Sequence, residues 1–102
     1  MLDHLTADTF LAHLGQMFTL HATATDTIDI ELVRVTPLGE TPAPGDSRAP
    51  RAPFSIAFKG PAQILLPQRI YAVEHAQLGR HSLFLVPLGP EQGGMIYEAV
   101  FG

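Results

Sequence analysis

The sequence contains no cysteine, so it has no disulfide framework, no thiolate zinc site and no thiol nucleophile. Basic residues are scarce too: 6 Lys and Arg face 10 Asp and Glu, for a formal net charge of −4. Nucleic acid and anionic membrane surfaces both require a basic face, so we expect neither as a partner. No apolar run approaches the roughly 20 residues of a membrane-spanning helix. The first residues lack a signal-peptide pattern, which favours cytoplasmic synthesis, with later incorporation into a larger particle left open.

Common catalytic signatures are also missing. The serines, Ser47, Ser55 and Ser82, lie outside any Gly-x-Ser-x-Gly nucleophile elbow. The pair Gly93-Gly94 leads into an expected strand rather than a helix, so it does not make a phosphate cradle. We therefore expect no catalytic residue, no cofactor and no enzymatic activity.

What the chain does have is apolar sequence. Hydrophobic residues make up 46% and charged residues only 16%, which is typical of one packed domain over residues 1–102. The low charge also suggests that part of the surface is apolar and is covered by a partner.

The first segment predicts a short helix over residues 6–14. Thr6 is a favourable N-cap, and Phe10, Leu11 and Leu14 have the spacing of one apolar stripe. A helix of two to three turns is not stable alone in water, so we expect it to dock on a sheet.

Alternating apolar and polar residues then predict strands. A phase slip near Leu32–Val33 indicates a β-bulge, and Gly60-Pro61 is expected to end the third strand. Residues 38–53, with four prolines and with Pro37 just before them, are expected to form an exposed loop. The fold prediction is mainly β: a small antiparallel β-barrel or sandwich of about six strands with one short N-terminal helix. The predicted strands cover residues 17–25, 27–36, 54–59, 69–75, 82–87 and 95–101.

Histidines are the first candidates for metal binding. His75 and His81 flank a turn at Leu78-Gly79, and with Glu74 or His21 they form a candidate set of ligands. The simpler interpretation is that His75 is half-buried and bonded to the turn backbone, while His81 faces solvent. His4 and His13, in the helical segment, are also expected to face water.

Paired carboxylates are the second candidates. Asp29 and Glu31 share the polar face of one strand, where a solvated surface is the simpler interpretation than acid–base catalysis. Glu98 is expected to make a cross-strand ion pair with Arg69 or Lys59.

Two segments near the end of the chain are candidates for protein contacts. Leu83–Val86 is apolar on both faces, which predicts burial on both sides under a helix or at a subunit contact. Met95–Phe101 is a candidate edge strand that a partner could extend. The interaction residues we predict are Leu83, Leu85, Ile96 and Val100.

Four segments of the chain form a distinctive set: Phe54-Ser-Ile-Ala-Phe-Lys-Gly-Pro, the run Gln68–Gly79, Phe84-Leu-Val-Pro-Leu-Gly and Tyr97-Glu-Ala-Val-Phe. Together they resemble a family of short bacterial proteins of unknown function. Family members tend to be encoded beside phage-tail-collar-like proteins, which implies an accessory or assembly role in a tail-like or fibre-like system. The resemblance brings no catalytic residue. The matching polar positions suggest a structural network that pins a hairpin to the last strand: Gln68, Tyr71, His75, Tyr97 and Glu98.

Three functional hypotheses follow. The first is a non-enzymatic module that self-associates, as a homo-oligomer, or binds a protein partner. The alternative is a small-ligand or metal-binding barrel with a site near Tyr71, His75 and Tyr97. The third, an enzyme using Glu98 and His75, has the least support.

Overall fold

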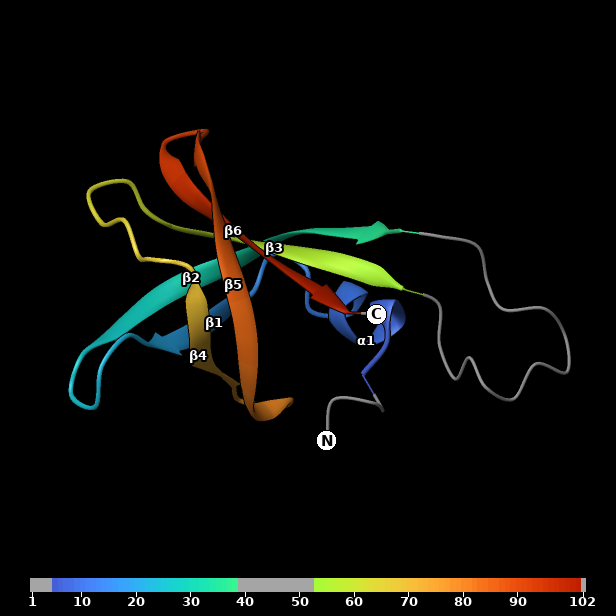
Figure 1. Ribbon diagram of the computed structural model, residues 1–102. Helices are drawn as coiled ribbons and strands as arrows, with labels where there is room; N and C mark the ends of the chain where they lie inside the picture. Colours follow the sequence, from blue (N-terminus) through green and yellow to red (C-terminus); the bar gives the residue numbers. More distant parts are fainter. Residues whose placement is uncertain (1–4, 39–52, 102) are drawn as a thin grey trace, which may run out of the picture.

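The computed structural model describes residues 5–38 and 53–101 (Figure 1). Most of the expected loop 38–53 lies outside these ranges. At its two ends, the backbone N–H of Leu38 donates to the carbonyl of Pro53 at 3.0 Å. The elements within the described ranges are α1 (Ala7–Leu11), β1 (Met17–His21), β2 (Thr27–Pro37), β3 (Phe54–Pro61), β4 (Arg69–His75), β5 (Gly79–Glu91) and β6 (Gly94–Phe101).

The strands form one closed antiparallel barrel in the order β1-β2-β3-β6-β5-β4, which confirms the predicted small barrel. Closure depends on a short ladder between β1 and β4, whose central pair is Leu20 and Val73. Strand β6 pairs with β3 on one side and β5 on the other. The prediction that Met95–Phe101 is an edge strand is therefore wrong, because β6 lies in the middle of the strand order, between β3 and β5.

Helix α1 begins as predicted and ends earlier. Thr6 is the N-cap, and its hydroxyl accepts a hydrogen bond from the backbone N–H of Thr9 in a capping box. The helix ends at Leu11 rather than Leu14. Only Phe10 of the expected apolar stripe is buried, while Leu11 and Leu14 are each 48% exposed. Because Leu11 and Leu14 are not buried, they do not provide the apolar packing that would stabilise further helical turns beyond Phe10.

Strands β2 and β3 follow the predictions in part. Their register shifts between Leu32 and Arg34, which confirms the predicted bulge. β3 runs two residues past the predicted 54–59 and ends at Pro61, because Gly60 pairs with Met95 and Pro61 with Gly94. Proline is tolerated there since it is the last residue of the strand.

Strand β5 is longer than the predicted 82–87 and has two partners. Its first half pairs with β4, from Gly79 to Leu85, and its second half pairs with β6, from Val86 to Glu91. Leu83 and Leu85 are buried inside the barrel, whereas Phe84 is 50% exposed. The prediction that Leu83–Val86 is buried on both sides is wrong, because no helix covers the outer face of Phe84 in the described part of the chain.

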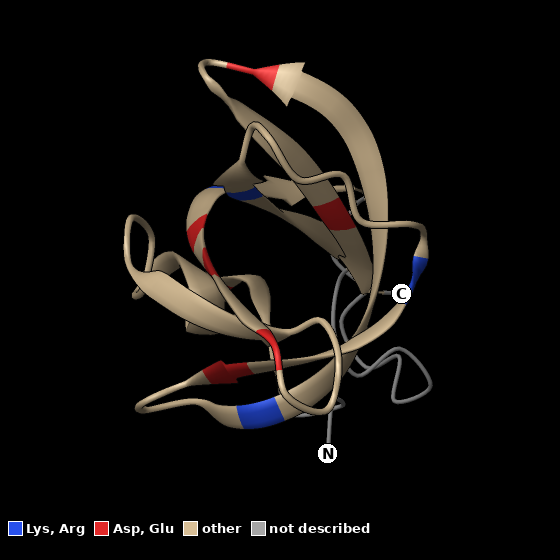
Figure 2. Cartoon of the chain, turned by 90° about the vertical axis from the view of Figure 1, so that its left-hand side faces the viewer, with Lys and Arg blue, Asp and Glu red and all other residues tan. Residues whose placement is uncertain are grey.

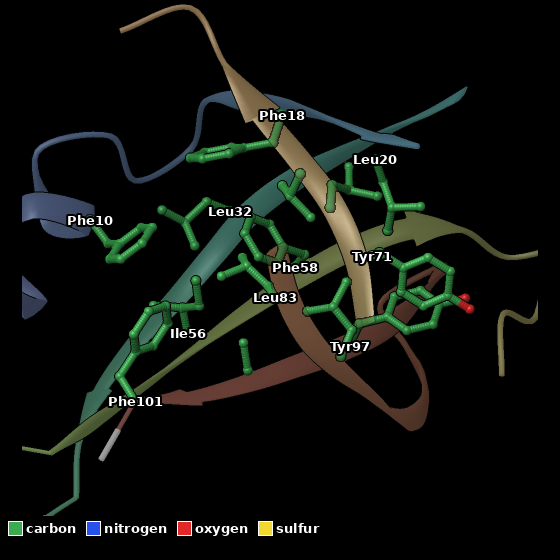
Figure 3. Close-up of a cluster of buried hydrophobic side chains, with 14 of the residues drawn as sticks. Phe10, Phe18, Leu20, Leu32, Ile56, Phe58, Tyr71, Leu83, Tyr97 and Phe101 are labelled. Carbon is green, nitrogen blue, oxygen red and sulfur yellow. The ribbon is translucent and has the colours of Figure 1, made fainter. Parts of the chain in front are cut away.

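The barrel interior is filled by side chains from every strand and from α1 (Figure 3). At one end, the rings of Phe54 and Phe101 stack with centroids 4.7 Å apart, and Phe10 from α1 packs on both. Phe18 and Phe58 meet edge to face farther inside, with centroids 5.1 Å apart. The short helix is thus held by its single buried aromatic ring.

Candidate functional site

Two large apolar side chains lie together on the outer face of β4 and β5. Ile70 and Phe84 are direct cross-strand partners. Their side chains are 65% and 50% exposed, although residues of this type are usually buried. Because opposite residues in an antiparallel pair have Cβ atoms about 5 Å apart, the two side chains form one continuous apolar surface. We call the outward-facing side of β4 and β5 the outer wall.

Charged residues flank this surface. Glu74 on β4 is the cross-strand partner of Arg80 on β5, four residues away from the Ile70–Phe84 pair along each strand. Both residues are exposed. Acidic and basic positions are otherwise scattered over several strands rather than gathered into one face (Figure 2). Along the β4–β5 ladder, the outer wall therefore carries an apolar pair and the oppositely charged pair of Glu74 and Arg80.

The four predicted interaction residues lie in different environments. Leu83 and Leu85 point into the interior, so a partner cannot reach them without opening the barrel. Ile96 is only 2% exposed, beside the cross-strand partners Lys59 and Gly89. Val100 is 62% exposed. Of the four, Val100 alone is accessible in this structure, and a partner at this residue stays a prediction.

The tyrosines lie at the end of the barrel opposite Phe54 and Phe101 (Figure 3). The hydroxyl of Tyr97 accepts from the backbone N–H of Leu66 at 3.0 Å and donates to the carbonyl of Ile64 at 3.2 Å. The hydroxyl of Tyr71 donates to the carbonyl of Pro67 at 2.6 Å. Burial raises the pKa of Tyr71, an effect partly offset by Arg69. Through these hydrogen bonds, both tyrosine hydroxyls stabilise the connection between β3 and β4.

His75 lies near the other end of β4 and holds the turn that follows. Its Nδ1 accepts hydrogen bonds from the backbone N–H groups of Gln77 and Leu78, at 3.1 and 3.3 Å. The ring proton is therefore on Nε2, which donates to Oε1 of Gln16 at 2.7 Å. This confirms the interpretation of His75 as a residue bonded to the turn backbone. Burial lowers the pKa of His75, and His13 lowers it further.

His13 was expected to face water, and the structure places it against His75. The two rings have centroids 4.5 Å apart, and His13 is half-buried. Nδ1 of His13 lies 3.0 Å from Oε1 of Gln16, so one amide oxygen contacts both rings. The expectation for His13 is wrong because the turn after α1 folds back over the end of β4. His4 lies outside the described residues.

The structure does not bring Tyr71, His75 and Tyr97 into one site. Tyr71 and Tyr97 lie at one end, and His75 is four residues away from Tyr71 along β4, about 13 Å at the usual rise per residue. The polar groups of all three bond to other parts of the chain. A ligand contacted by all three at once does not fit this geometry.

The candidate metal ligands are separated as well. Nε2 of His81 donates to the carbonyl of Leu78 at 2.7 Å. His21 contacts Glu74 at 3.0 Å on the outer wall, whereas His75 points inward. Within residues 5–38 and 53–101, no three His, Asp or Glu side chains gather closely enough to hold a metal ion.

Comparison with known proteins gives one family match. Residues 5–101 match the family described as "Domain of unknown function (DUF6916)". The chain belongs to this family. No curated protein and no solved structure matches it. In the described residues of this DUF6916 domain, no helix has the length and apolar character needed to cross a membrane.

The remaining members of the expected polar network do not act together in the DUF6916 domain. Gln68 is exposed at the start of β4, and Glu98 is half-buried on the outward side of β6. The expected ion pair of Glu98 with Arg69 or Lys59 is wrong: the described ion pairs are His21–Glu74 and Arg34–Glu91.

Sequence reasoning missed the Ile70–Phe84 pair and the role of Gln16. The alternation of β4 did contain a signal for the first, because Tyr71, Val73 and His75 share the inner face and Ile70 must then face outward. No local pattern indicated that Gln16 contacts His75, a residue 59 positions away.

Proposed function

We propose that the DUF6916 domain is a non-enzymatic interaction module that self-associates through its outer wall. The observation that supports this proposal is the exposed pair of Ile70 and Phe84, 65% and 50% accessible on adjacent strands. Exposed apolar residues are usually scattered singly, and neighbouring ones often mark a contact surface. Aromatic residues are also enriched at such surfaces.

The polar side chains inside the DUF6916 domain support a structural rather than a catalytic role. His75, Tyr71 and Tyr97 each bond to the backbone of a turn or connection. A general acid or base must be able to contact a substrate, and these groups are already engaged in holding loops. The arrangement explains their presence without invoking a reaction.

The resemblance noted in the sequence extends this proposal to a biological setting. We infer that the DUF6916 domain is an accessory or assembly protein of a tail-like or fibre-like particle in bacteria, made in the cytoplasm. A small closed barrel with an exposed apolar pair on its outer wall suits such a role, because repeated contacts between small rigid subunits build large assemblies.

Light scattering over a concentration series tests the proposal. The wild-type protein should have a mass above that of the monomer, and Ile70→Glu should return it to the monomer mass. Leu65→Glu is the matched control, because Leu65 is 67% exposed and lies in the connection between β3 and β4 rather than on the outer wall. A strictly monomeric wild-type protein, or equal effects of the two substitutions, would overturn it.

A further inference from the structure

One half of β5 has a strand on only one of its two edges. Its ladder with β6 runs from the pair Glu91–Gly94 to the pair Val86–Glu98 and stops there. From Leu85 back to Gly79, β5 pairs with β4 alone. In Figure 1, the lower half of β5 runs away from β6, which turns toward the C-terminus. No other strand within the described residues occupies the side that β6 leaves.

This half-strand has the features of an edge that can accept a further strand. Arg80, Ser82 and Phe84 are all exposed, and residues 79–85 contain no proline. A strand edge presents backbone N–H and C=O groups in a row, which is a template for pairing with another chain. An antiparallel partner can therefore extend the sheet here.

The sequence of the half-strand complements itself. If two copies run antiparallel about a two-fold axis at Ser82, each Ser82 lies opposite the other, and Arg80 lies opposite Phe84 of the second copy. Both side chains point outward, since Arg80, Ser82 and Phe84 alternate with the inward-facing Leu83 and Leu85. An arginine beside an aromatic ring is a favourable cation–π pair, and the two-fold axis forms it twice.

The neighbouring strand adds to this complementarity. Within one copy, Ile70 is opposite Phe84, and Glu74 is opposite Arg80. In the joined sheet, four side chains would lie side by side across neighbouring strands. In order, these are Ile70 and Phe84 of one copy, then Arg80 and Glu74 of the second copy. Arg80 would thus lie between a carboxylate and an aromatic ring, and no like charges would face each other.

We propose that two copies of the DUF6916 domain join edge to edge through residues 79–85 of β5, antiparallel and centred on Ser82. This inference rests on the proposed self-association and specifies its geometry. The result is one continuous sheet in which β4 and β5 of one barrel are followed by β5 and β4 of the other.

A single introduced cysteine tests the geometry directly, because the chain has no cysteine of its own. Paired residues of antiparallel strands have Cα atoms about 4.5 to 5.5 Å apart, within the range of a disulfide. Under mild oxidation at low protein concentration, Ser82→Cys should form a disulfide-linked dimer at least tenfold faster than Thr25→Cys, an exposed turn control. Equal rates for the two variants would overturn the edge pairing.

Exchanging the arginine at position 80 and the phenylalanine at position 84 provides the second test. Phe84→Arg places a second guanidinium opposite Arg80 of the other copy, so the mass should fall to that of the monomer. Adding Arg80→Phe restores an aromatic–arginine pair across the axis, so the double variant should regain the dimer mass. A double variant that remains a monomer while Ser82→Cys shows no preferential crosslinking would contradict the proposal. If Phe84→Arg does not fold, the Ser82→Cys comparison still decides.

The two proposals fail in different ways. If the wild-type protein self-associates, Ile70→Glu abolishes this association and Ser82→Cys crosslinks no faster than its control, the edge pairing is wrong and the interaction module stands. A wild-type protein that is monomeric at every concentration overturns both.

Discussion

Gln16 and His75 are separated by 59 positions in the sequence, and their side chains meet at 2.7 Å between Oε1 and Nε2. Gln16 belongs to the turn after α1, and His75 ends β4. The contact therefore ties the N-terminal segment to the β4–β5 turn. Since Nδ1 of His75 accepts from two backbone N–H groups, the fold requires the neutral imidazole.

Stability should consequently depend on pH through His75. Its pKa in the folded protein is lowered, first by burial and then by His13, so the unfolded state binds its proton more readily. The stabilisation is fully present above the unfolded pKa of about 6.5 and is lost as pH falls through the lower folded value. Other charged or titratable groups near this end are His81, near the start of β5, and, on the outer face, His21, Glu74 and Arg80.

Urea unfolding at pH 7.5 and pH 5 checks this prediction. His75→Phe should be less stable than wild type at pH 7.5, and its stability should change less between the two pH values. Leu78→Ala is the control in the same turn, because it removes packing without removing a titratable group. If His75→Phe keeps the full wild-type pH dependence, the titration of another group explains the effect.

The sequence predicted those parts of the fold that depend on local periodicity. The alternation in β2 and β6 indicated the buried faces, and the phase slip at Leu32 indicated the bulge, because side-chain direction follows directly from position along a strand. It failed at Leu83–Val86. An apolar residue on the second face of a strand, such as Phe84, looks the same whether another element covers it or not.

Contacts between distant segments were beyond local reasoning. Pairing of β6 with β3 removed the expected free edge of β6, and it joins residues more than forty positions apart, such as Phe54 and Phe101. Closure between β1 and β4 likewise joins distant residues, such as Leu20 and Val73. The contact of Gln16 with His75 arises in the same way. Tyr71 and His75 were correctly predicted to face inward. They lie toward opposite ends of β4, so they do not contribute to one site.

The Tyr97 hydroxyl should stabilise the connection between β3 and β4 more than the Tyr71 hydroxyl does. Tyr97→Phe leaves both the N–H of Leu66 and the carbonyl of Ile64 without this partner, whereas Tyr71→Phe affects only the carbonyl of Pro67. A partner lost by a buried polar group costs about 1–3 kcal/mol. Urea unfolding should therefore rank Tyr97→Phe as the less stable variant, and hydrogen exchange should show faster opening of the Leu66 amide. The reverse ranking would contradict the assignment.

Thr6 should contribute to the stability of the whole barrel through the capping box. Its hydroxyl accepts from the N–H of Thr9, and the Thr9 hydroxyl accepts from the N–H of Thr6. Thr6→Ala should lower the free energy of unfolding by about 1 kcal/mol, whereas Thr6→Ser, which keeps the hydroxyl, should remain close to wild type. Thermal unfolding of the three proteins measures the difference. Equal losses for Ala and Ser would show that the methyl group of Thr6, rather than its hydroxyl, is responsible.

Gly94 should be harder to replace than Gly60, the other glycine without a positive φ in the described part of the chain. A Cβ at this position would lie 2.7 Å from the carbonyl oxygen of Gly60 and 2.4 Å from Cγ of Lys59. The lysine side chain can move, but the carbonyl belongs to the β3–β6 ladder and cannot move without separating the strands. Gly94→Ala should therefore destabilise the protein by about 1–3 kcal/mol, as expected for overpacking at a rigid contact.

Gly60→Ala is the matched control on the facing strand. The nearest atoms to a Cβ there are Cγ2 of Ile30 at 3.4 Å and Cε2 of Tyr97 at 3.5 Å, both in side chains and at ordinary contact distance. This variant should be clearly more stable than Gly94→Ala when the two urea midpoints are compared. Because both substitutions add one methyl group to the same ladder, the difference between them isolates the clash with the backbone. Equal midpoints would mean that β3 and β6 adjust freely at this pair, and the strand end at Pro61 would then be less rigid than the ladder indicates.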